Sequence, residues 1–188
     1  MRTLLQKTTN SKELHVVESV FSQQELEFID EYCSYDLEGL GESHRVGWDK
    51  RLTAGMSGDI NITRIDSKMD EELFELIVSK CFDAYSIKLN RDNCTIQYYE
   101  SQAKSGINWH DDGDRAGAIT IYLTQDWNRD YGGLFSFCMN EDNGLYTSIL
   151  PRRNTMLLQK GGVDHGVTQT TDNAPIRRSL QIWIYELH

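Results

Sequence analysis

Cysteine is scarce in this chain, and the cysteines that are present are scattered. The 188 residues include only four of them, none in a C-x-x-C pair: Cys33, Cys81, Cys94 and Cys138. A disulfide framework or a zinc knuckle needs cysteines at close and regular spacings. We therefore expect reduced, mostly buried thiols, and neither a disulfide scaffold nor a zinc site built on cysteine.

Long apolar runs and an excess of basic charge are also missing. No stretch approaches the roughly 20 apolar residues of a membrane-spanning helix, and the N-terminus becomes polar too early for a signal peptide. We therefore expect a cytoplasmic protein with no membrane partner. The formal net charge is −10, from 29 acidic and 19 basic residues. Because non-specific binding of nucleic acid needs a basic surface, no nucleic-acid partner is expected.

The chain shows no sign of a division into separate domains. It has only two prolines, no internal repeat, no low-complexity tract and no Pro/Ser-rich linker. Its length suits one domain that buries a core without disulfides. We expect a single domain over 1–188, with helical support in 1–92 and a β-rich core in 93–188.

Two helices are expected in the first half of the chain. One runs over about 22–37, because Ser22 and Glu25 have the S-x-x-E spacing of a capping box. The other runs over about 67–89, with Ser67 as its cap and an apolar stripe at helical spacing.

The segment between these helices, 38–59, has no clear periodicity. It contains five glycines together with Arg45, Trp48 and Arg51. Glycine content and aromatic and basic side chains favour a lid over a site, and an ordinary surface loop is the alternative.

After residue 90 the pattern changes to short strands. Seven segments are rich in β-forming residues and are separated by Gly, Asn and Asp: 94–101, 116–124, 133–137, 147–150, 154–159, 162–168 and 177–187. Such a series is typical of a sandwich, a barrel or a jelly roll. The expected class is mainly β (α+β), with the two helices packed outside one sheet.

Two of these strands have one apolar and one polar face. Ile119 and Ile121 alternate with Thr120 and Tyr122 in one strand. In the last strand Leu180, Ile182 and Ile184 share a face with Arg178, and the opposite face carries Arg177, Ser179, Gln181, Trp183 and Tyr185. A solvent-exposed face would normally carry Lys and Glu, so we favour a polar-lined cleft.

His110 and Asp112 form a His-x-Asp pair next to a predicted strand. Side chains at i and i+2 of an extended chain point the same way, so both can bind one cation. His165 lies 53 residues after Asp112 and can supply a third ligand. Two histidines and one carboxylate form the facial triad of non-haem iron oxygenases. Singly, each residue is equally consistent with a solvated or packed side chain.

Five stretches together resemble the prolyl 4-hydroxylase-like branch of the iron(II)/2-oxoglutarate dioxygenases. The resemblance spans about half of the chain, and the N-terminal helices suit the support that this family gives its barrel. It implies a double-stranded β-helix (jelly-roll) core. The stretches are WHDD at 109–112, IYLTQDW at 121–127, YGGLF at 131–135, HGV at 165–167 and RRSLQIW at 177–183.

The resemblance implies that His110, Asp112 and His165 hold iron at the catalytic centre. It also implies a basic residue shortly after the second histidine, which binds the far carboxylate of 2-oxoglutarate. Arg177 and Arg178 lie 12 and 13 positions beyond His165. Strand alternation favours Arg177, and the guanidinium suits this role because it binds a carboxylate through two parallel hydrogen bonds.

Two tyrosines complete the expected cofactor site. Tyr122 corresponds to a tyrosine that in some members donates its hydroxyl to the same carboxylate. Tyr99, on the strand before His110, is a weaker candidate, because the distance in sequence to His110 is longer than usual and a core tyrosine is the alternative reading.

The activity that the resemblance implies is hydroxylation of an unactivated C–H bond. Fe(II), 2-oxoglutarate and O2 are used, succinate and CO2 are released, and ascorbate is an optional reductant. The substrate would be a prolyl residue of a peptide or protein, a free amino acid or a similar small molecule. Two alternatives are a non-catalytic jelly-roll metal-binding or sensing protein and a cupin-like metalloenzyme that does not use 2-oxoglutarate. The sequence leaves the substrate and the oligomeric state open.

Overall fold

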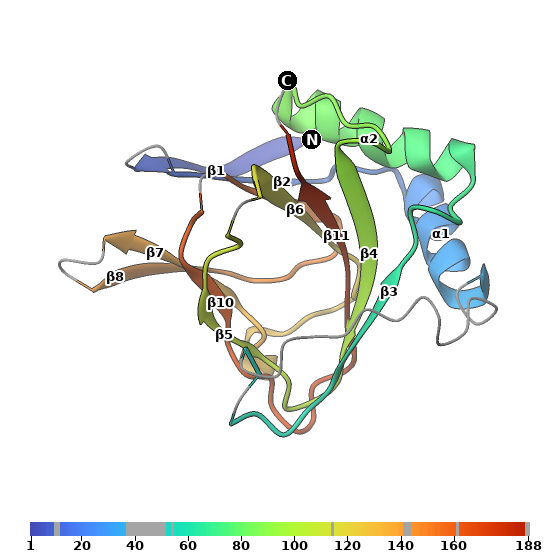
Figure 1. The fold of residues 1–188 in the computed structure, drawn as a ribbon. Coiled ribbons are helices and arrows are strands. Elements are labelled where there is room, and N and C mark those ends of the chain that lie inside the picture. Colours follow the sequence, from blue (N-terminus) through green and yellow to red (C-terminus); the bar gives the residue numbers. More distant parts are fainter. Residues whose placement is uncertain are drawn as a thin grey trace.

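The computed structural model describes residues 1–9, 12–36, 52–53, 55–113, 115–140, 144–160 and 162–186. Within them two antiparallel sheets face each other, and helices lie outside the larger sheet (Figure 1). In chain order the elements are β1 Arg2–Thr9, β2 Lys12–Glu18, α1 Gln23–Glu31, a π-helical turn Tyr32–Asp36, β3 Ile60–Arg64, α2 Glu71–Tyr85, β4 Cys94–Ser101, β5 Ile107–His110, β6 Gly117–Tyr122, a 3-10 helix Arg129–Tyr131, β7 Phe135–Asn140, β8 Leu145–Ile149, β9 Thr155–Lys160, β10 His165–Val167 and β11 Arg177–Ile184.

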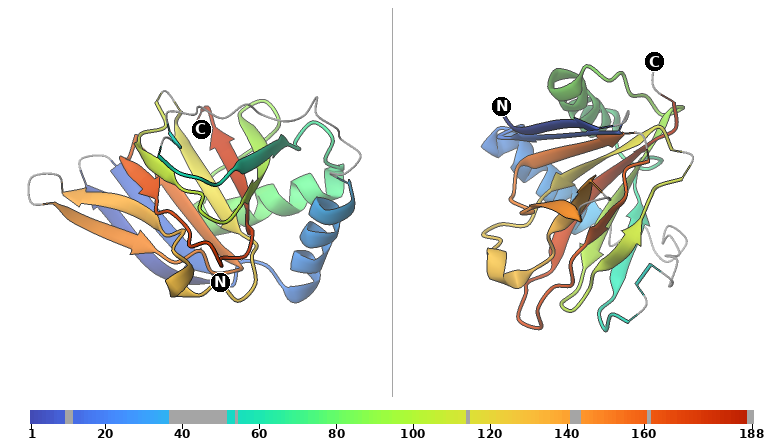
Figure 2. Two further views of the ribbon diagram at one scale, coloured as in Figure 1. Left: turned by 90° about the horizontal axis from the view of Figure 1, so that it is seen from below. Right: turned by 90° about the vertical axis from the view of Figure 1, so that its left-hand side faces the viewer.

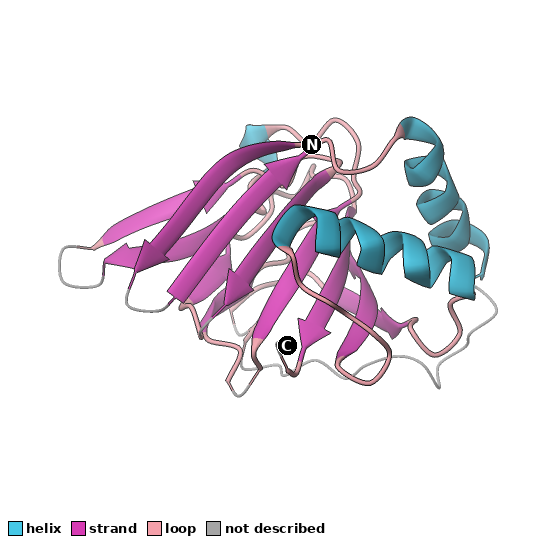
Figure 3. Ribbon diagram, turned by 90° about the horizontal axis from the view of Figure 1, so that it is seen from above, coloured by secondary structure: helices cyan, strands magenta, loops and turns pink. Residues whose placement is uncertain are grey.

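The strand order identifies the fold. The larger sheet runs β1-β2-β9-β6-β11-β4-β3 and the smaller sheet β5-β10-β7-β8. Strands distant in sequence are therefore neighbours, as in a jelly roll. Figure 2 shows the two layers from two further directions, and Figure 3 shows α2 lying across the outer face of the larger sheet. The expected mainly β class, with a jelly-roll core and helices outside one sheet, is confirmed.

The two faces of β6 and β11 have different neighbours. Ile119 and Ile121 of β6 and Ile182 of β11 are fully buried in the cluster that includes the apolar side chains of α1 and α2. Tyr122 lies in a second cluster, which β7 of the smaller sheet completes. The predicted alternation is therefore confirmed: the apolar face packs against the helices, and the opposite face lines the space between the sheets.

The predicted capping box at α1 is present. The Ser22 hydroxyl accepts the backbone N–H of Glu25 at 3.2 Å, and the Glu25 carboxylate accepts the backbone N–H of Ser22 at 2.6 Å. The α-helix ends earlier than expected, at Glu31, and the chain continues as a π-helical turn to Asp36.

The second helix begins later than the sequence predicts. Its N-cap is Asp70, which accepts the N–H of Leu73 at 2.9 Å, and not Ser67. The preceding residues are held differently, because the buried Asp66 carboxylate binds Arg64 and the backbone N–H of Ile96. The helix ends at Tyr85, before Ser86 in the left-handed conformation. Of the helices in the described ranges, none has both the length and the apolar character to cross a bilayer.

The expectation that 1–92 is helical support is only partly right. β1, β2 and β3 also lie in this half, and all three belong to the larger sheet. β2 pairs with β9, and its Leu14 and Val16 are fully buried between the sheets. Their period-2 alternation is the signal for this strand, but polar neighbours on both sides weaken it.

Most of the proposed lid at 38–59 lies outside the residues that the structure describes. Arg45, Trp48 and Arg51 all lie outside the described residues, so the lid stays a prediction.

No disulfide joins the four cysteines, all of which lie in the described ranges. Cys33, Cys81 and Cys94 are buried. Burial raises the pKa of Cys94 to about 11, so its thiol stays protonated and unreactive near neutral pH.

Gly132 provides a test of the turn that leads into β7. Its φ is +70°, and a Cβ placed there would lie 2.3 Å from the carbonyl oxygen of Gln169. We expect Gly132→Ala to lower the free energy of unfolding by about 2 kcal/mol or more, because the positive φ and the clash with the Gln169 carbonyl both destabilise the folded state. Gly144→Ala is the matched control, because φ is +64° and nothing lies within 4 Å of the added Cβ. Equal losses in urea denaturation would show that the clash is relieved.

Candidate active site

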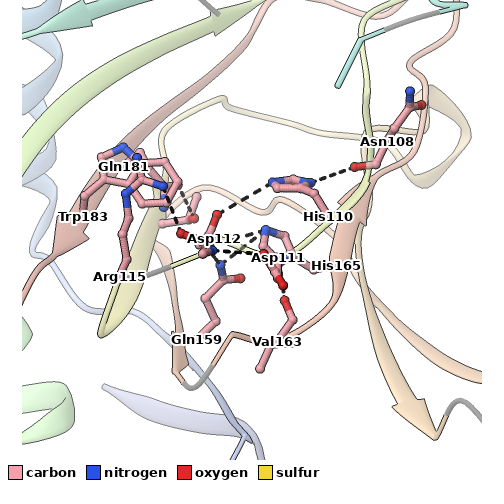
Figure 4. A network of polar contacts seen from close by, with 12 residues as sticks. Asn108, His110, Asp111, Asp112, Arg115, Gln159, Val163, His165, Gln181 and Trp183 are labelled. Atoms are coloured by element: carbon pink, nitrogen blue, oxygen red, sulfur yellow. Dashed lines mark hydrogen bonds and ion pairs between the residues drawn. The ribbon is translucent and has the colours of Figure 1, made fainter. Parts of the chain in front are cut away.

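The three expected metal ligands come together at one end of the smaller sheet. His110 is the last residue of β5, His165 is the first residue of β10, and the two pair directly across the sheet. Asp112 follows His110 by two residues. One ligand atom from each of the three lies within 4.8 Å of the others (Figure 4). The i, i+2 spacing therefore places this carboxylate beside both imidazoles.

Backbone carbonyls fix the orientation of both imidazoles. Nδ1 of His110 lies 2.8 Å from the carbonyl oxygen of Asn108, and Nδ1 of His165 lies 2.7 Å from that of Val163. A carbonyl only accepts, so each Nδ1 carries the proton and each Nε2 keeps a lone pair. Burial lowers the pKa of His165, which favours the neutral ring. Both Nε2 atoms are therefore available to a cation.

Asp112 supplies the negative charge of the site, and within the described residues no lysine or arginine forms a salt bridge with its carboxylate. Its side chain is 7% exposed, and its ion-pair contacts are to Nε2 of His110 at 3.7 Å and of His165 at 3.8 Å. A buried carboxylate is costly without a cation. Two neutral imidazoles and one carboxylate are the donor set of a divalent metal such as iron, so the residues present fit the predicted ion.

A pocket opens from these ligands into the space between the sheets. Phe135 of β7 stacks on the ring of His165, with 5.2 Å between the ring centroids. The pocket is lined by Tyr99, Ile107, His110, Thr120, Tyr122, Phe135, Gln159, His165, Val167, Arg177, Ser179, Gln181 and Trp183. The expected cleft is therefore present, and its polar side chains come mainly from β6, β9 and β11 of the larger sheet.

Arg177 and Tyr122 lie together inside this pocket, and each has one buried polar atom without a hydrogen-bond partner among the described residues. They are 5% and 1% exposed, and the guanidinium carbon is 5.1 Å from the centroid of the tyrosine ring. Nε of Arg177 and the Tyr122 hydroxyl are buried without a hydrogen-bond partner in the described part of the chain. Burial lowers the pKa of Arg177 and raises the pKa of Tyr122. An anionic oxygen ligand would satisfy both groups.

The structure separates the two arginine candidates. Arg177 lines the pocket, and Arg178 lies on the opposite face of β11. Tyr99 also lines the pocket, but its hydroxyl donates to Oε1 of Gln97 at 3.1 Å. Tyr99 is therefore placed beside the site with one proton already committed, and its cofactor role stays a prediction.

The sequence did not single out Gln159, whose amide contacts Asp112 and His165. It is the last but one residue of β9, on the face that it shares with the apolar Leu157. The pairing of β9 with β6 brings it near Asp112, and His165 follows it by six residues in the chain. A polar residue near the end of a strand is common, so the sequence alone does not indicate that Gln159 lies beside the ligands.

Comparison with known proteins finds one matching family model and several solved structures with a similar fold. The sequence model of the 2OG-Fe(II) oxygenase superfamily matches residues 94–185. A search of curated protein sequences finds no match.

Several solved structures have a similar fold. A prolyl-4-hydroxylase of Pseudomonas putida has 15% identity and a TM-score of 0.64, with 91% of each chain covered. A Trichoplax adhaerens prolyl hydroxylase in complex with a hypoxia inducible factor peptide fragment has 15% identity and a TM-score of 0.69, covering 91% of this chain and 82% of that one. An oxidoreductase of the 2OG-Fe(II) oxygenase family from Burkholderia pseudomallei has 17% identity and a TM-score of 0.65, covering 93% and 86%.

Proposed function

We propose that this chain, whose residues 94–185 match the model of the 2OG-Fe(II) oxygenase superfamily, is an Fe(II)- and 2-oxoglutarate-dependent dioxygenase that hydroxylates an unactivated C–H bond. The observation that supports this proposal most strongly is that a candidate metal site and a candidate carboxylate-binding site lie in one pocket. A cation site made by two imidazoles and a carboxylate shares the pocket with Nε of Arg177 and the hydroxyl of Tyr122, which are buried without a hydrogen-bond partner in the described part of the chain.

This combination favours an oxygenase over the two other classes. A metal-binding or sensing protein without turnover has no use for a buried guanidinium aimed into the same pocket. A cupin-like enzyme that does not use 2-oxoglutarate would likewise leave Arg177 and Tyr122 without a ligand, at a cost of about 1–3 kcal/mol for each unsatisfied group.

The residues of the pocket would have different roles in the proposed reaction. Bound Fe(II) with 2-oxoglutarate and O2 supplies the oxidising chemistry, which releases succinate and CO2 and puts one oxygen atom into the substrate. His110, Asp112 and His165 would hold the metal and leave positions open for the cosubstrates. Arg177 and Tyr122 would bind the far carboxylate of 2-oxoglutarate and so orient its keto acid end toward the metal. Phe135 and Ile107 contribute apolar walls that exclude water.

The proposed substrate is a prolyl residue in a peptide or protein, or else a free amino acid. The similar Trichoplax adhaerens structure contains a peptide fragment, which supports the first choice. The pocket lies beside Trp183, whose side chain is 8% exposed, and would enclose a small ring or aliphatic side chain.

Succinate formation from 2-oxoglutarate tests the proposed reaction. The Fe(II)-loaded protein, with ascorbate as reductant, is incubated with prolyl peptides and with free amino acids. We expect succinate and, with the right substrate, a product heavier by one oxygen atom in mass spectrometry. Folded, iron-loaded protein that forms no succinate with any of them would favour one of the two other classes.

Tyr122→Phe isolates the phenol of the proposed carboxylate site. We expect the KM for 2-oxoglutarate to rise about 10- to 100-fold with kcat little changed, because one hydrogen bond to a charged group is lost. Burial raises the pKa of Tyr122, so the hydroxyl stays a donor and the effect persists through neutral pH. The measurement is succinate formation against 2-oxoglutarate concentration, and an unchanged KM would remove Tyr122 from the site.

A further inference from the structure

Gln159 lies between two of the three candidate metal ligands. It belongs to β9 and is 5% exposed. Its amide nitrogen is hydrogen-bonded to Oδ2 of Asp112 and lies 3.3 Å from Nε2 of His165 (Figure 4). Its amide oxygen is buried and has no hydrogen-bond partner among the described residues. The side chain therefore uses its nitrogen, and not its oxygen, to contact the ligands.

Hydrogen-bond chemistry supports this orientation of the amide. Nδ1 of His165 faces a carbonyl oxygen at 2.7 Å and carries the ring proton, so Nε2 can only accept. The ionised Asp112 carboxylate can also only accept. Since both neighbours are acceptors, the group between them is the NH2 end of the amide, and each of its two protons has a partner.

A neutral donor suits this position better than a cationic one. The NH2 group satisfies the lone pairs of Asp112 and His165 without a charge that would repel a metal ion. A cation bound at Nε2 of His165 would displace only that one contact of the amide. The contact of Gln159 with Oδ2 of Asp112 is compatible with a metal bound through Oδ1, the oxygen that lies 3.7 Å from Nε2 of His110.

We propose that Gln159 is a positioning residue of the metal centre. Its N–H holds Oδ2 of Asp112, so that the carboxylate presents Oδ1 as its single ligand atom and does not take a second position on the metal. The positions left open for 2-oxoglutarate and O2 then depend on this hydrogen bond. The inference rests on the proposed function only in requiring that a divalent metal bind at His110, Asp112 and His165.

The test is a titration of the protein with Co(II) alone, followed by visible absorption, without 2-oxoglutarate or substrate. Gln159→Met keeps the approximate size of the side chain and removes both donors. We expect the Co(II) affinity to fall roughly 10- to 100-fold, as for other residues that orient a metal ligand. The absorption bands should also change, because a freed carboxylate can bind through both oxygens.

Gln181→Met is the matched control. Gln181 lines the same pocket and contacts Thr120 at 2.6 Å, but it contacts none of the three ligands. Its Co(II) affinity and spectrum should match those of the original protein. Gln159→Leu is measured in the same way if the Met variant does not give the native circular dichroism spectrum.

The outcomes separate the inference from the proposed function. Co(II) binding by Gln159→Met with unchanged affinity and spectrum would overturn the positioning role. Tighter binding would also overturn it, because the amide would then compete with the metal. If the original protein binds no Co(II), the metal centre itself is wrong and the proposed function fails with it.

Discussion

Replacing Asp112 with alanine is expected to abolish turnover, with a loss on the order of 10³-fold or more in succinate formation. Asp112 is the only anionic member of the ligand set, and its side chain is 7% exposed. Without it two neutral imidazoles remain, which hold a divalent cation weakly. A metal ion contributes several kcal/mol of transition-state stabilisation, and this contribution is lost with the ion.

Asp111→Ala is the control for this prediction. Asp111 is the preceding residue and is exposed, and its carboxylate accepts the backbone N–H of Gly113 at 3.1 Å. We expect this variant to keep both Co(II) binding and succinate formation. If Asp111→Ala loses as much activity as Asp112→Ala, the two carboxylates do not differ as the structure places them.

Arg177→Met is expected to raise the KM for 2-oxoglutarate roughly 10²-fold or more while metal affinity stays unchanged. The guanidinium is 5% exposed, and no salt bridge to it is found within the described residues, so its charge is available to a ligand carboxylate. Removing one partner of a buried charge pair costs about 2–5 kcal/mol. The side chain belongs to β11 of the larger sheet and, within the described residues, forms no hydrogen bond or salt bridge with any of the three ligands, so we expect Co(II) binding to survive.

Arg178→Met distinguishes a specific effect from a general loss of positive charge on β11. Arg178 projects from the opposite face of the strand, toward the helices. Its replacement should leave the KM for 2-oxoglutarate as it is. The reverse result, with Arg178→Met raising KM and Arg177→Met without effect, would mean that the strand faces the other way.

The facing of β11 could be predicted because a strand repeats every two residues. Leu180 and Ile182 require burial, so the alternate residues must face the other layer, and Arg177 is among them. The His-x-Asp pair could be found for the same reason, since i and i+2 share a face. Local periodicity is therefore sufficient for the ligands that lie on one strand and for the choice between adjacent arginines.

Gln159 and β2 could not be predicted in this way. The contact of Gln159 with Asp112 depends on the pairing of β9 with β6, which joins residues about forty positions apart, and nothing in the sequence around Gln159 indicates that pairing. β2 lies beside β9 by a still longer connection, and the short alternation of Leu14 and Val16 is too weak a signal to place this strand in the sheet. The start of α2 was predicted too early. The buried carboxylate of Asp66 holds the residues before the helix through hydrogen bonds with Arg64 and with the backbone N–H of Ile96.

The most direct test of the central claim is turnover of 2-oxoglutarate under isotope-labelled dioxygen with the Fe(II)-loaded protein. A dioxygenase of the proposed kind places one atom of O2 in succinate and the other in the hydroxylated product. We predict that the succinate formed is heavier by one labelled oxygen, and that Asp112→Ala forms none. Succinate without the label, or 2-oxoglutarate left intact by the metal-loaded protein, would contradict the account.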